Sequence, residues 1–224
     1  MSSVHQEGRW GKVLLEGAAE FGIGLSARQI SELTVYAEEL IAWNNKINLT
    51  AITHPDQIAI KHFVDSLACS QAIMVPPPHA MLDIGTGAGF PGLPLKILYP
   101  EMDVILLEPS QKKTAFLRHL IGTLDLKRAT VLPKRIQDIV KEPDYQGRFT
   151  LIVTRALGVG TLLRLIPPLL TKQGKVILCR SKPLENKMDL NGLRKMKEIG
   201  YELPRGYGHR VLTVLEPAFP ISAH

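Results

Sequence analysis

The sequence predicts an α/β fold in which a helical N-terminal extension precedes a mostly parallel, Rossmann-like sheet that ends in an antiparallel C-terminal hairpin. Apolar residues recur at helical spacing before residue 75. After residue 79, short apolar runs alternate with helical stretches, and the first run leads directly into a glycine-rich turn. Continuous apolar strands that alternate with helices are typical of a parallel sheet covered on both faces.

Residues 1–75 are expected to form the helical extension. Ser26 and Gln29 form a capping box, which starts the second of three helices. The predicted helices cover residues 9–21, 27–43 and 57–74. The run Pro76–Pro78 can neither continue a helix nor pair within a sheet, so it separates the extension from the second part of the chain.

Residues 79–217 are expected to form one domain of alternating strands and helices. The predicted strands cover residues 81–84, 104–107, 130–132, 151–154 and 175–179. The predicted helices lie near residues 93–99, 111–124, 160–170 and 185–199. A hairpin of residues 201–205 and 210–216 is expected at the edge of the sheet, because a short glycine-containing turn joins these two segments.

Composition narrows the class of protein. A chain of 224 residues fits one domain, or one domain with a small appendage. The 45% of hydrophobic residues excludes a disordered polar chain. The net charge of +6 permits a polyanionic partner without demonstrating one.

The chain carries no signal for a metal, a disulfide scaffold or a membrane. Its two cysteines, Cys69 and Cys179, form no CxxC pair and no Cys/His cluster, so we expect two buried, reduced thiols and no bound metal. Residues 1–12 do not resemble a signal peptide, and no apolar run reaches about 18 residues. These features predict a cytoplasmic protein, and we expect it to be a monomer.

The glycine-rich turn indicates the class of cofactor. The strand that ends at Asp83 and Ile84 is followed by glycines at 85, 87 and 89, which let the backbone approach a ligand closely. The dinucleotide pattern GxGxxG would need a third glycine where Phe90 stands, and Pro91 removes an amide that a pyrophosphate would use. The Asp83 carboxylate would repel a diphosphate but could receive an ammonium group. The pattern therefore favours S-adenosylmethionine over NAD.

Glu108 ends the second predicted strand, 23 residues after Gly85. An acidic side chain at this position accepts hydrogen bonds from the two hydroxyls of a ribose. NAD and S-adenosylmethionine both carry such a ribose, so Glu108 indicates a nucleoside and does not choose between them.

The end of the fourth predicted strand, Val153–Ala156, indicates the kind of methyl acceptor. It carries neither the Asn/Asp-Pro-Pro-aromatic tetrad usual for exocyclic amines nor the cysteine nucleophile that a pyrimidine carbon requires. A ring nitrogen with a free lone pair, such as guanine N7, needs neither, because it has no proton to remove. Proximity and alignment can then supply about 7–11 kcal/mol of the barrier.

At these residues the chain resembles the RsmG (GidB) family, the bacterial 16S ribosomal RNA guanine-N7 methyltransferases. The resemblance extends from about Glu32 to Leu215. It is carried by Trp43–Thr50, Lys61–Leu67 and Asp83–Pro94, and the run Gly-Phe-Pro-Gly-Leu-Pro is its most specific part. It implies methyl transfer from S-adenosylmethionine to a guanine N7 of 16S ribosomal RNA or of the small ribosomal subunit.

The resemblance also implies a set of cofactor contacts. Gly85 and Phe90 match loop positions at the cofactor, and Arg155 matches an arginine close to the methyl group, where we expect it to be catalytic. The full set of expected cofactor contacts is Asp83, Gly85, Gly87, Gly89, Phe90, Glu108, Pro109, Ser110, Ile136, Gln137 and Arg155.

Three single residues and one short segment depart from the pattern implied by the resemblance. Glu108 stands where the family usually has Asp, and Gln137 stands where Glu is commoner. Thr150 stands where Asp is common, and Arg180–Lys182 replaces a usual Lys-Gly pair. These departures leave the glycine turn and Arg155 unchanged.

Basic and polar residues outside the turn are candidates for contacts with RNA. They are Asn48, Lys61, His62, Arg180, Lys182, His209 and Arg210. Few aromatic residues lie among them, which favours recognition of shape and phosphates over stacking on single strands.

Two alternatives stay open at this stage. A small-molecule methyltransferase on the same fold would explain the turn but not the basic excess. A non-catalytic ribosome-assembly or RNA-binding factor would keep the fold without binding S-adenosylmethionine.

Overall fold

A computed structural model of the chain describes residues 2–73, 79–155, 158–185 and 187–218, with side chains from residue 10 onward. Seven strands form one sheet in the order β3-β2-β1-β4-β5-β7-β6. The strands are β1 (Ala80–Ile84), β2 (Asp103–Leu107), β3 (Ala129–Leu132), β4 (Phe149–Thr154), β5 (Leu170–Arg180), β6 (Leu193–Glu202) and β7 (His209–Pro217). Strands β1 to β5 pair in parallel, whereas β7 pairs antiparallel with both β5 and β6. The predicted fold class, including the antiparallel hairpin, is confirmed. The predicted first strand of the hairpin, residues 201–205, is misplaced, because the strand is Leu193–Glu202 and a 3-10 turn occupies Pro204–Gly206.

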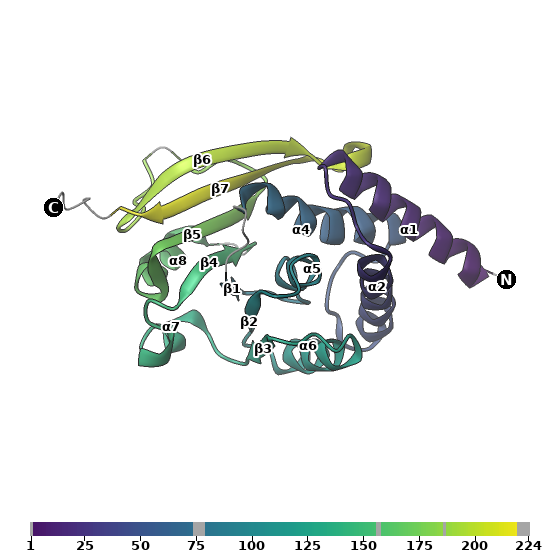
Figure 1. Ribbon diagram of the computed structural model, residues 1–224, viewed down its shortest axis with the longest axis horizontal. Coiled ribbons are helices and arrows are strands. Elements are labelled where there is room, and N and C mark those ends of the chain that lie inside the picture. The colour runs from purple at the N-terminus through teal and green to yellow at the C-terminus, as the bar shows by residue number, and fades with distance from the viewer. Residues whose placement is uncertain (1, 74–78, 156–157, 186, 219–224) are drawn as a thin grey trace.

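Helices cover both faces of the sheet (Figure 1). They are α1 (Ser2–Glu20), α2 (Ala27–Ile47), α3 (Pro55–Ile58), α4 (Asp65–Ala68), α5 (Gly92–Leu98), α6 (Gln111–Thr123), α7 (Ile136–Ile139) and α8 (Val159–Leu165). Alternation along each strand divides the interior into two cores, so that Met81 packs with the helices α1 to α6 while Leu82 packs with α7 and α8. This two-faced burial accounts for the continuous apolar strands.

The N-terminal helices share a hydrophobic core with the sheet. Tyr36 of α2 and Phe63 are completely buried, in the same cluster as Met81 of β1 and Leu212 of β7. The contacts continue through Gln29, whose side-chain amide donates to the carbonyl oxygens at the end of α5. The N-terminal region therefore shares one core with the sheet: α2 packs against α5 and α6, and the 3-10 turn Cys69–Ala72 packs against β5 and β7.

The capping box at the start of α2 is confirmed, because Ser26 Oγ accepts from the amide of Gln29 and the Gln29 side chain accepts in return. The predicted end at Trp43 is wrong. The helix continues to Ile47 and ends at Asn48, which adopts the left-handed conformation at φ 52°. Asn44 Oδ1 accepts from the amide of Thr50 at 2.8 Å and holds the chain that follows the helix.

The predicted helix over residues 57–74 is a run of different helical types. A π-helical segment, Ala59–Val64, joins α3 to α4, and a 3-10 turn, Cys69–Ala72, follows. A π-helix moves its side chains out of the ordinary helical register and is frequent at functional sites. Met74 and the dividing run Pro76–Pro78 lie outside the described residues.

Two predictions of local structure are wrong, and one short helix was not predicted. The helix expected near residues 185–199 is absent, because residues 193–202 form β6 at the edge of the sheet. The short helix α7 was not predicted, and α1 begins at Ser2 instead of near residue 9. The expected burial of Cys69 and Cys179 is confirmed, and their sulfur atoms lie 3.1 Å apart as free thiols.

Membrane insertion by a helix is not supported in the described part of the chain, where no helix is both long and apolar enough to cross a bilayer.

Candidate cofactor and substrate site

Four predicted site residues follow the carboxyl ends of neighbouring parallel strands. Gly85 follows β1, Glu108 follows β2, Ile136 lies just beyond β3, and Arg155 follows β4. Parallel strands present their carboxyl ends at one edge of the sheet, which is where open α/β sheets bind ligands. The topology therefore brings these residues to one side of the molecule.

The three glycines of the turn differ in their surroundings. Their φ values of 69°, 61° and 102° lie in the left-handed region, which explains the residue type. Gly85 is exposed and Gly87 half-buried, and no heavy atom lies within 4 Å of a Cβ built on Gly87. Gly89 is buried, and a Cβ there would overlap Tyr36 Oη. Only the first two glycines leave a backbone surface open to a ligand.

Asp83 holds the turn together from inside. Its Oδ2 accepts from Thr86 Oγ1 at 2.6 Å and from the amide of Gly92 at 2.7 Å. A Cβ on Gly92 would lie 2.6 Å from the same oxygen, which explains the glycine there. Burial raises the pKa of Asp83 to about 6, although the hydrogen bonds and Arg155 oppose this shift. Asp83 Oδ1 is buried with no hydrogen-bond partner among the described residues.

Glu108 faces the turn from the neighbouring strand. Its Oε2 accepts from the amide of Gly87 at 3.0 Å and its Oε1 accepts from the amide of Ser110 at 2.9 Å. Each carboxylate oxygen can accept a second hydrogen bond. Glu108 thus fixes the position of Gly87 and keeps acceptor capacity for a ligand.

We expect Glu108→Gln to raise the Kd for S-adenosylmethionine by about 10- to 100-fold, because one charged acceptor pair contributes about 1.5–3 kcal/mol. The glutamine amide can accept at only one of the two positions that now receive backbone N–H groups. Isothermal titration calorimetry measures the change. Glu142→Gln is the matched control, since the Glu142 carboxylate pairs with the partly exposed Lys134, outside the site. Equal affinities of the two variants would contradict the assignment.

Phe90 connects the turn to the N-terminal helices. Its ring stacks with Tyr36 at 5.1 Å and with His62 at 4.7 Å between ring centroids. The Arg155 guanidinium lies 5.5 Å from the same ring centroid, within the range of a cation–π contact. Phe90 is only 3% exposed, so its ring is part of the core under the site. The same ring contacts Arg155 directly.

His62 is held in its neutral form. Burial, together with the positive charges of Arg155 and Lys61, lowers its pKa to about 3. Arg155 Nη2 lies 3.5 Å from Nδ1, and a guanidinium can only donate, so this geometry assigns the ring proton to Nε2. Nε2 lies 2.9 Å from Thr50 Oγ1, which receives that proton as a hydrogen bond.

This neutral histidine predicts a loss of stability in acid. The pKa of His62 is below its ordinary value in the folded state, so the unfolded chain binds more protons between about pH 6.5 and pH 3, and stability falls as the pH falls through this range. At pH 4.5 the cost is about 3 kcal/mol.

Urea unfolding at pH 7.5 and pH 4.5 measures this effect. We expect His62→Gln to lose about 3 kcal/mol less than the parent chain between these two values. Asp83 changes stability in the opposite direction, since its raised pKa favours the folded state below about pH 6. Because Asp83 is present in both chains, the difference between them isolates His62, and identical pH slopes would contradict the prediction.

A basic hollow of about 550 Å³ lies next to Arg155. Five of its lining residues are cationic, and all five were predicted as catalytic or RNA-contacting positions. They are Lys61, Arg155, Arg180, Lys182 and Arg210. Asp65 is the only carboxylate among the described residues that line it, and Arg180 Nη1 is buried there with no hydrogen-bond partner in the described part of the chain. The hollow therefore suits an anionic ligand.

Arg155 is anchored on the π-helical segment. Its Nη1 donates to the carbonyl oxygen of Lys61 at 3.1 Å and lies 3.4 Å from Asp65 Oδ2. Its side chain remains 25% exposed. The guanidinium is thus oriented by the N-terminal helices while part of it stays available in the basic hollow.

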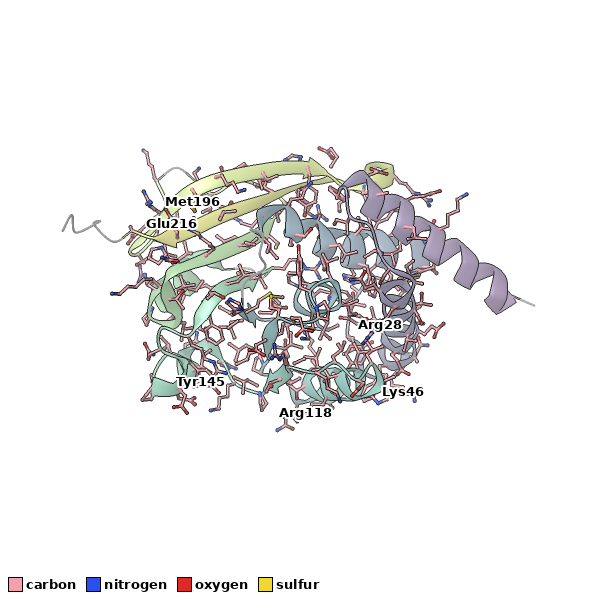
Figure 2. The ribbon with its side chains drawn as sticks, in the orientation of Figure 1. Arg28, Lys46, Arg118, Tyr145, Met196 and Glu216 are labelled. Carbon is pink, nitrogen blue, oxygen red and sulfur yellow. The ribbon has the colours of Figure 1, made fainter. Side chains whose placement is uncertain are left out.

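Some predicted residues lie away from this hollow. Asn48 caps α2 and is exposed, and the exposed His209 pairs with Glu202 at 2.8 Å. Ile136 is buried in the second core, whereas Gln137 and Pro109 are exposed. Arg118, which was not predicted to be a site residue, is exposed on the outer side of α6 (Figure 2).

Thr150, a departure from the family pattern, has a local structural role. It exchanges hydrogen bonds with the backbone of Ala80 at the start of β1, at the opposite end of the strands from the turn. This departure therefore does not touch the site.

Tyr36, Asp65 and Tyr201 are part of the site but were not predicted as site residues. Lys61 and Asp65 are four residues apart, which was the one available signal that they share a helix face. Tyr201 comes from the other end of the chain, and the sequence carries no signal of its contact with Asp65.

The sheet order and the glycine turn define a Rossmann-like methyltransferase fold. A ribosomal protein L11 methylase from Lactobacillus delbrueckii subsp. bulgaricus shares the fold with a TM-score of 0.51 at 14% identity, over 71% of this chain and 79% of that chain. TrmN from Thermus thermophilus gives a TM-score of 0.53 at 19% identity, over 69% of this chain and 48% of that chain. Identities this low establish the fold alone.

The chain belongs to the rRNA small subunit methyltransferase G (GidB) family, whose sequence profile matches residues 29–199. It is 43% identical over 166 residues to the ribosomal RNA small subunit methyltransferase G of Roseiflexus sp. (strain RS-1), covering 74% of this chain and 70% of the relative. The protein of that name from Dehalococcoides mccartyi (strain CBDB1) is 37% identical and covers 91% of this chain and 89% of the relative. The predicted resemblance is confirmed.

Proposed function

We propose that this protein transfers a methyl group from S-adenosylmethionine to N7 of a guanine in 16S ribosomal RNA. One observation carries the proposal: an anchored arginine lines a basic hollow and also contacts Phe90, which follows the glycine turn of a methyltransferase fold. Family membership supports the reaction class, because the relatives are named as methyltransferases of small-subunit ribosomal RNA. Family membership also argues against the two alternatives, a small-molecule methyltransferase and a non-catalytic assembly factor.

The residues around the turn fit S-adenosylmethionine. Gly85 and Gly87 offer a backbone surface without side chains, and Glu108 has acceptor capacity for the ribose hydroxyls. Asp83 Oδ1, which has no hydrogen-bond partner in the described part of the chain, is the oxygen left for the ammonium group. When bound, the sulfonium supplies an electrophilic methyl group. The proposed cofactor set is completed by Ser110, Pro109, Ile136, Gln137 and Phe90, by Arg155 at the methyl end, and by Gly89, which shapes the turn from inside.

Arg155 orients the acceptor base in this proposal. Its guanidinium can donate to O6 of a guanine and leave N7 free for attack, and guanine O6 is a common acceptor for arginine. N7 carries no proton, so no general base is required, and the neutral His62 serves to hold Arg155 in place. Alignment and proximity are then the main sources of rate.

The basic hollow is proposed to receive the RNA. Lys61, Arg180, Lys182 and Arg210 provide positive charge at its lining, which suits phosphate groups. His62, which also lines the hollow, and Asn48 and His209, which lie outside its lining, remain proposed RNA contacts. We propose that residues 1–75 and the domain over residues 79–217 act together as a monomer, on 16S ribosomal RNA or on the small ribosomal subunit in the cytoplasm.

Mapping of N7-methylguanine tests the reaction. Small-subunit RNA from a strain lacking the enzyme is incubated with the protein and S-adenosylmethionine, then cleaved chemically at N7-methylguanine and read by primer extension. We expect one new site. Methylation confined to an amino group or a carbon would overturn the proposal.

A further inference from the structure

The buried carboxylate of Asp65 lies where the N-terminal helices, the strand end that carries Arg155 and the C-terminal hairpin meet. Its side chain is 4% exposed. Oδ1 accepts from the Tyr201 hydroxyl at 2.7 Å, and Oδ2 lies 3.4 Å from Arg155 Nη1 and 3.6 Å from Arg210 Nε. Each oxygen therefore has its own kind of partner, a neutral hydroxyl on one side and two cations on the other.

Asp65 is the charged partner that holds Arg155. Within the described part of the chain, the other polar contacts of that guanidinium are neutral, namely the Lys61 carbonyl oxygen and His62 Nδ1. Asp83 interacts with Arg155 only electrostatically, at longer range, and its Oδ2 accepts a hydrogen bond from Thr86 within the turn. Without the Asp65 charge, the long and flexible side chain of Arg155 would be held by weaker contacts.

The Tyr201 hydroxyl fixes the orientation of the Asp65 carboxylate. It stands on β6, 136 positions along the chain from Asp65, and its ring packs edge-on against Phe21 of the N-terminal region. Burial and the nearby Asp65 charge raise the pKa of Tyr201 far above its ordinary value, so its hydroxyl keeps the donated proton. The donor fixes Oδ1 and thereby the direction in which Oδ2 faces Arg155.

We propose that Asp65, oriented by Tyr201, is a positioning residue for methyl transfer that acts through Arg155. The proposal rests on the proposed function, since it assumes that Arg155 orients the acceptor base. Among the described residues, Tyr201 and Asp65 form no hydrogen bond with the turn or with Glu108, and Asp65 reaches the proposed cofactor set only through Arg155. They are therefore expected to act on the methyl-transfer step and not on cofactor binding.

A double-mutant cycle between Asp65→Asn and Arg155→Gln tests this role. We expect Asp65→Asn to lower kcat by about 10- to 100-fold, the scale of a small misplacement of a reacting group. The Kd for S-adenosylmethionine should stay within about threefold of the parent value. In the Arg155→Gln background the same substitution should cost less than about threefold, because the residue through which it acts is already gone.

Glu198→Gln is the matched control. Glu198 is a partly buried carboxylate of the same hairpin that accepts from the amide of Leu184 and from Thr213 Oγ1 and pairs with Lys195, and no hydrogen bond or ion pair joins it to Arg155 in the described part of the chain. It should change the melting temperature without changing kcat. If Asp65→Asn lowers kcat by the same factor in both backgrounds, the positioning role is overturned.

Tyr201→Phe keeps the test decisive if Asp65→Asn does not fold. This variant retains the buried ring and loses only the hydroxyl, so we expect a loss of about 3- to 10-fold in kcat that disappears in the Arg155→Gln background. An unchanged kcat, or a loss that persists there, would overturn the proposal. The outcomes remain distinct from failure of the proposed function, in which the parent chain itself would add no methyl group to guanine N7.

Discussion

Replacing Arg155 with glutamine is expected to lower kcat for RNA methylation by about 100-fold or more. The guanidinium is fixed by contacts to Lys61 and Asp65 and is adjacent to the glycine turn through Phe90. Loss of one oriented donor at a reacting group typically costs about 10²–10³ in rate, equivalent to about 3–4 kcal/mol. Single-turnover transfer of a labelled methyl group at saturating RNA measures the effect directly.

The Arg155→Gln variant should bind S-adenosylmethionine within about threefold of the parent chain, because Glu108 and the turn are untouched. Arg118→Gln is the control, since Arg118 is exposed on the outer side of α6 and changes the net charge by the same amount. Equal losses in the two variants would show that total charge, and not the position of Arg155, sets the rate. A parallel loss of cofactor affinity would show that Arg155 acts mainly on the cofactor.

The strands around the turn could be predicted because burial on both faces makes them uniformly apolar. Strands β1, β2 and β4 match their predicted cores within two residues. Strand β6 could not be recognised in this way. Residues Arg194 to Lys197 of β6 are exposed and have charged or flexible side chains, as is usual for an edge strand. The pairing of β6 with β7 decides the conformation of this segment. A local pattern rich in lysine and leucine indicates a helix until that long-range pairing is known.

The composition of the basic hollow could be predicted, but its geometry could not. Lys61, Arg155, Arg180 and Arg210 lie on four separate elements, and the sequence indicates only that each of them is basic. Their convergence depends on the topology, which places β5 beside β7 and lays the π-helical segment against Arg155. The Asp65–Tyr201 hydrogen bond has the same origin, since it joins residues that are adjacent only after the hairpin has paired.

The three glycines of the turn illustrate a further limit. Sequence spacing treats Gly85, Gly87 and Gly89 as equivalent, because each supplies a left-handed residue. The packing separates them into an open face at Gly85 and Gly87 and a buried contact at Gly89. This separation leads to opposite expectations for two substitutions that look alike in the sequence.

Gly89→Ala is expected to destabilise the protein by about 3 kcal/mol or more, through overpacking and backbone strain together. The new methyl group would overlap Tyr36 Oη and lie 2.8 Å from Leu93 Cδ1, at a φ of 102° that alanine rarely adopts. Tyr36 cannot move aside without losing its hydrogen bond to the carbonyl of Ala88 and its stacking on Phe90. Urea unfolding at pH 7.5 measures the loss.

Gly87→Ala should show the reverse behaviour. Its methyl group meets no atom within 4 Å, so the stability cost is the strain of a left-handed alanine alone, about 1–2 kcal/mol. The same methyl group stands on the open face of the turn, beside the amide that donates to Glu108, where it would obstruct a cofactor that lies against the backbone. We expect at least a tenfold rise in the Kd for S-adenosylmethionine. If Gly87→Ala binds the cofactor normally while Gly89→Ala folds normally, the turn does not receive its ligand at the open face, and the assignment of the site fails with it.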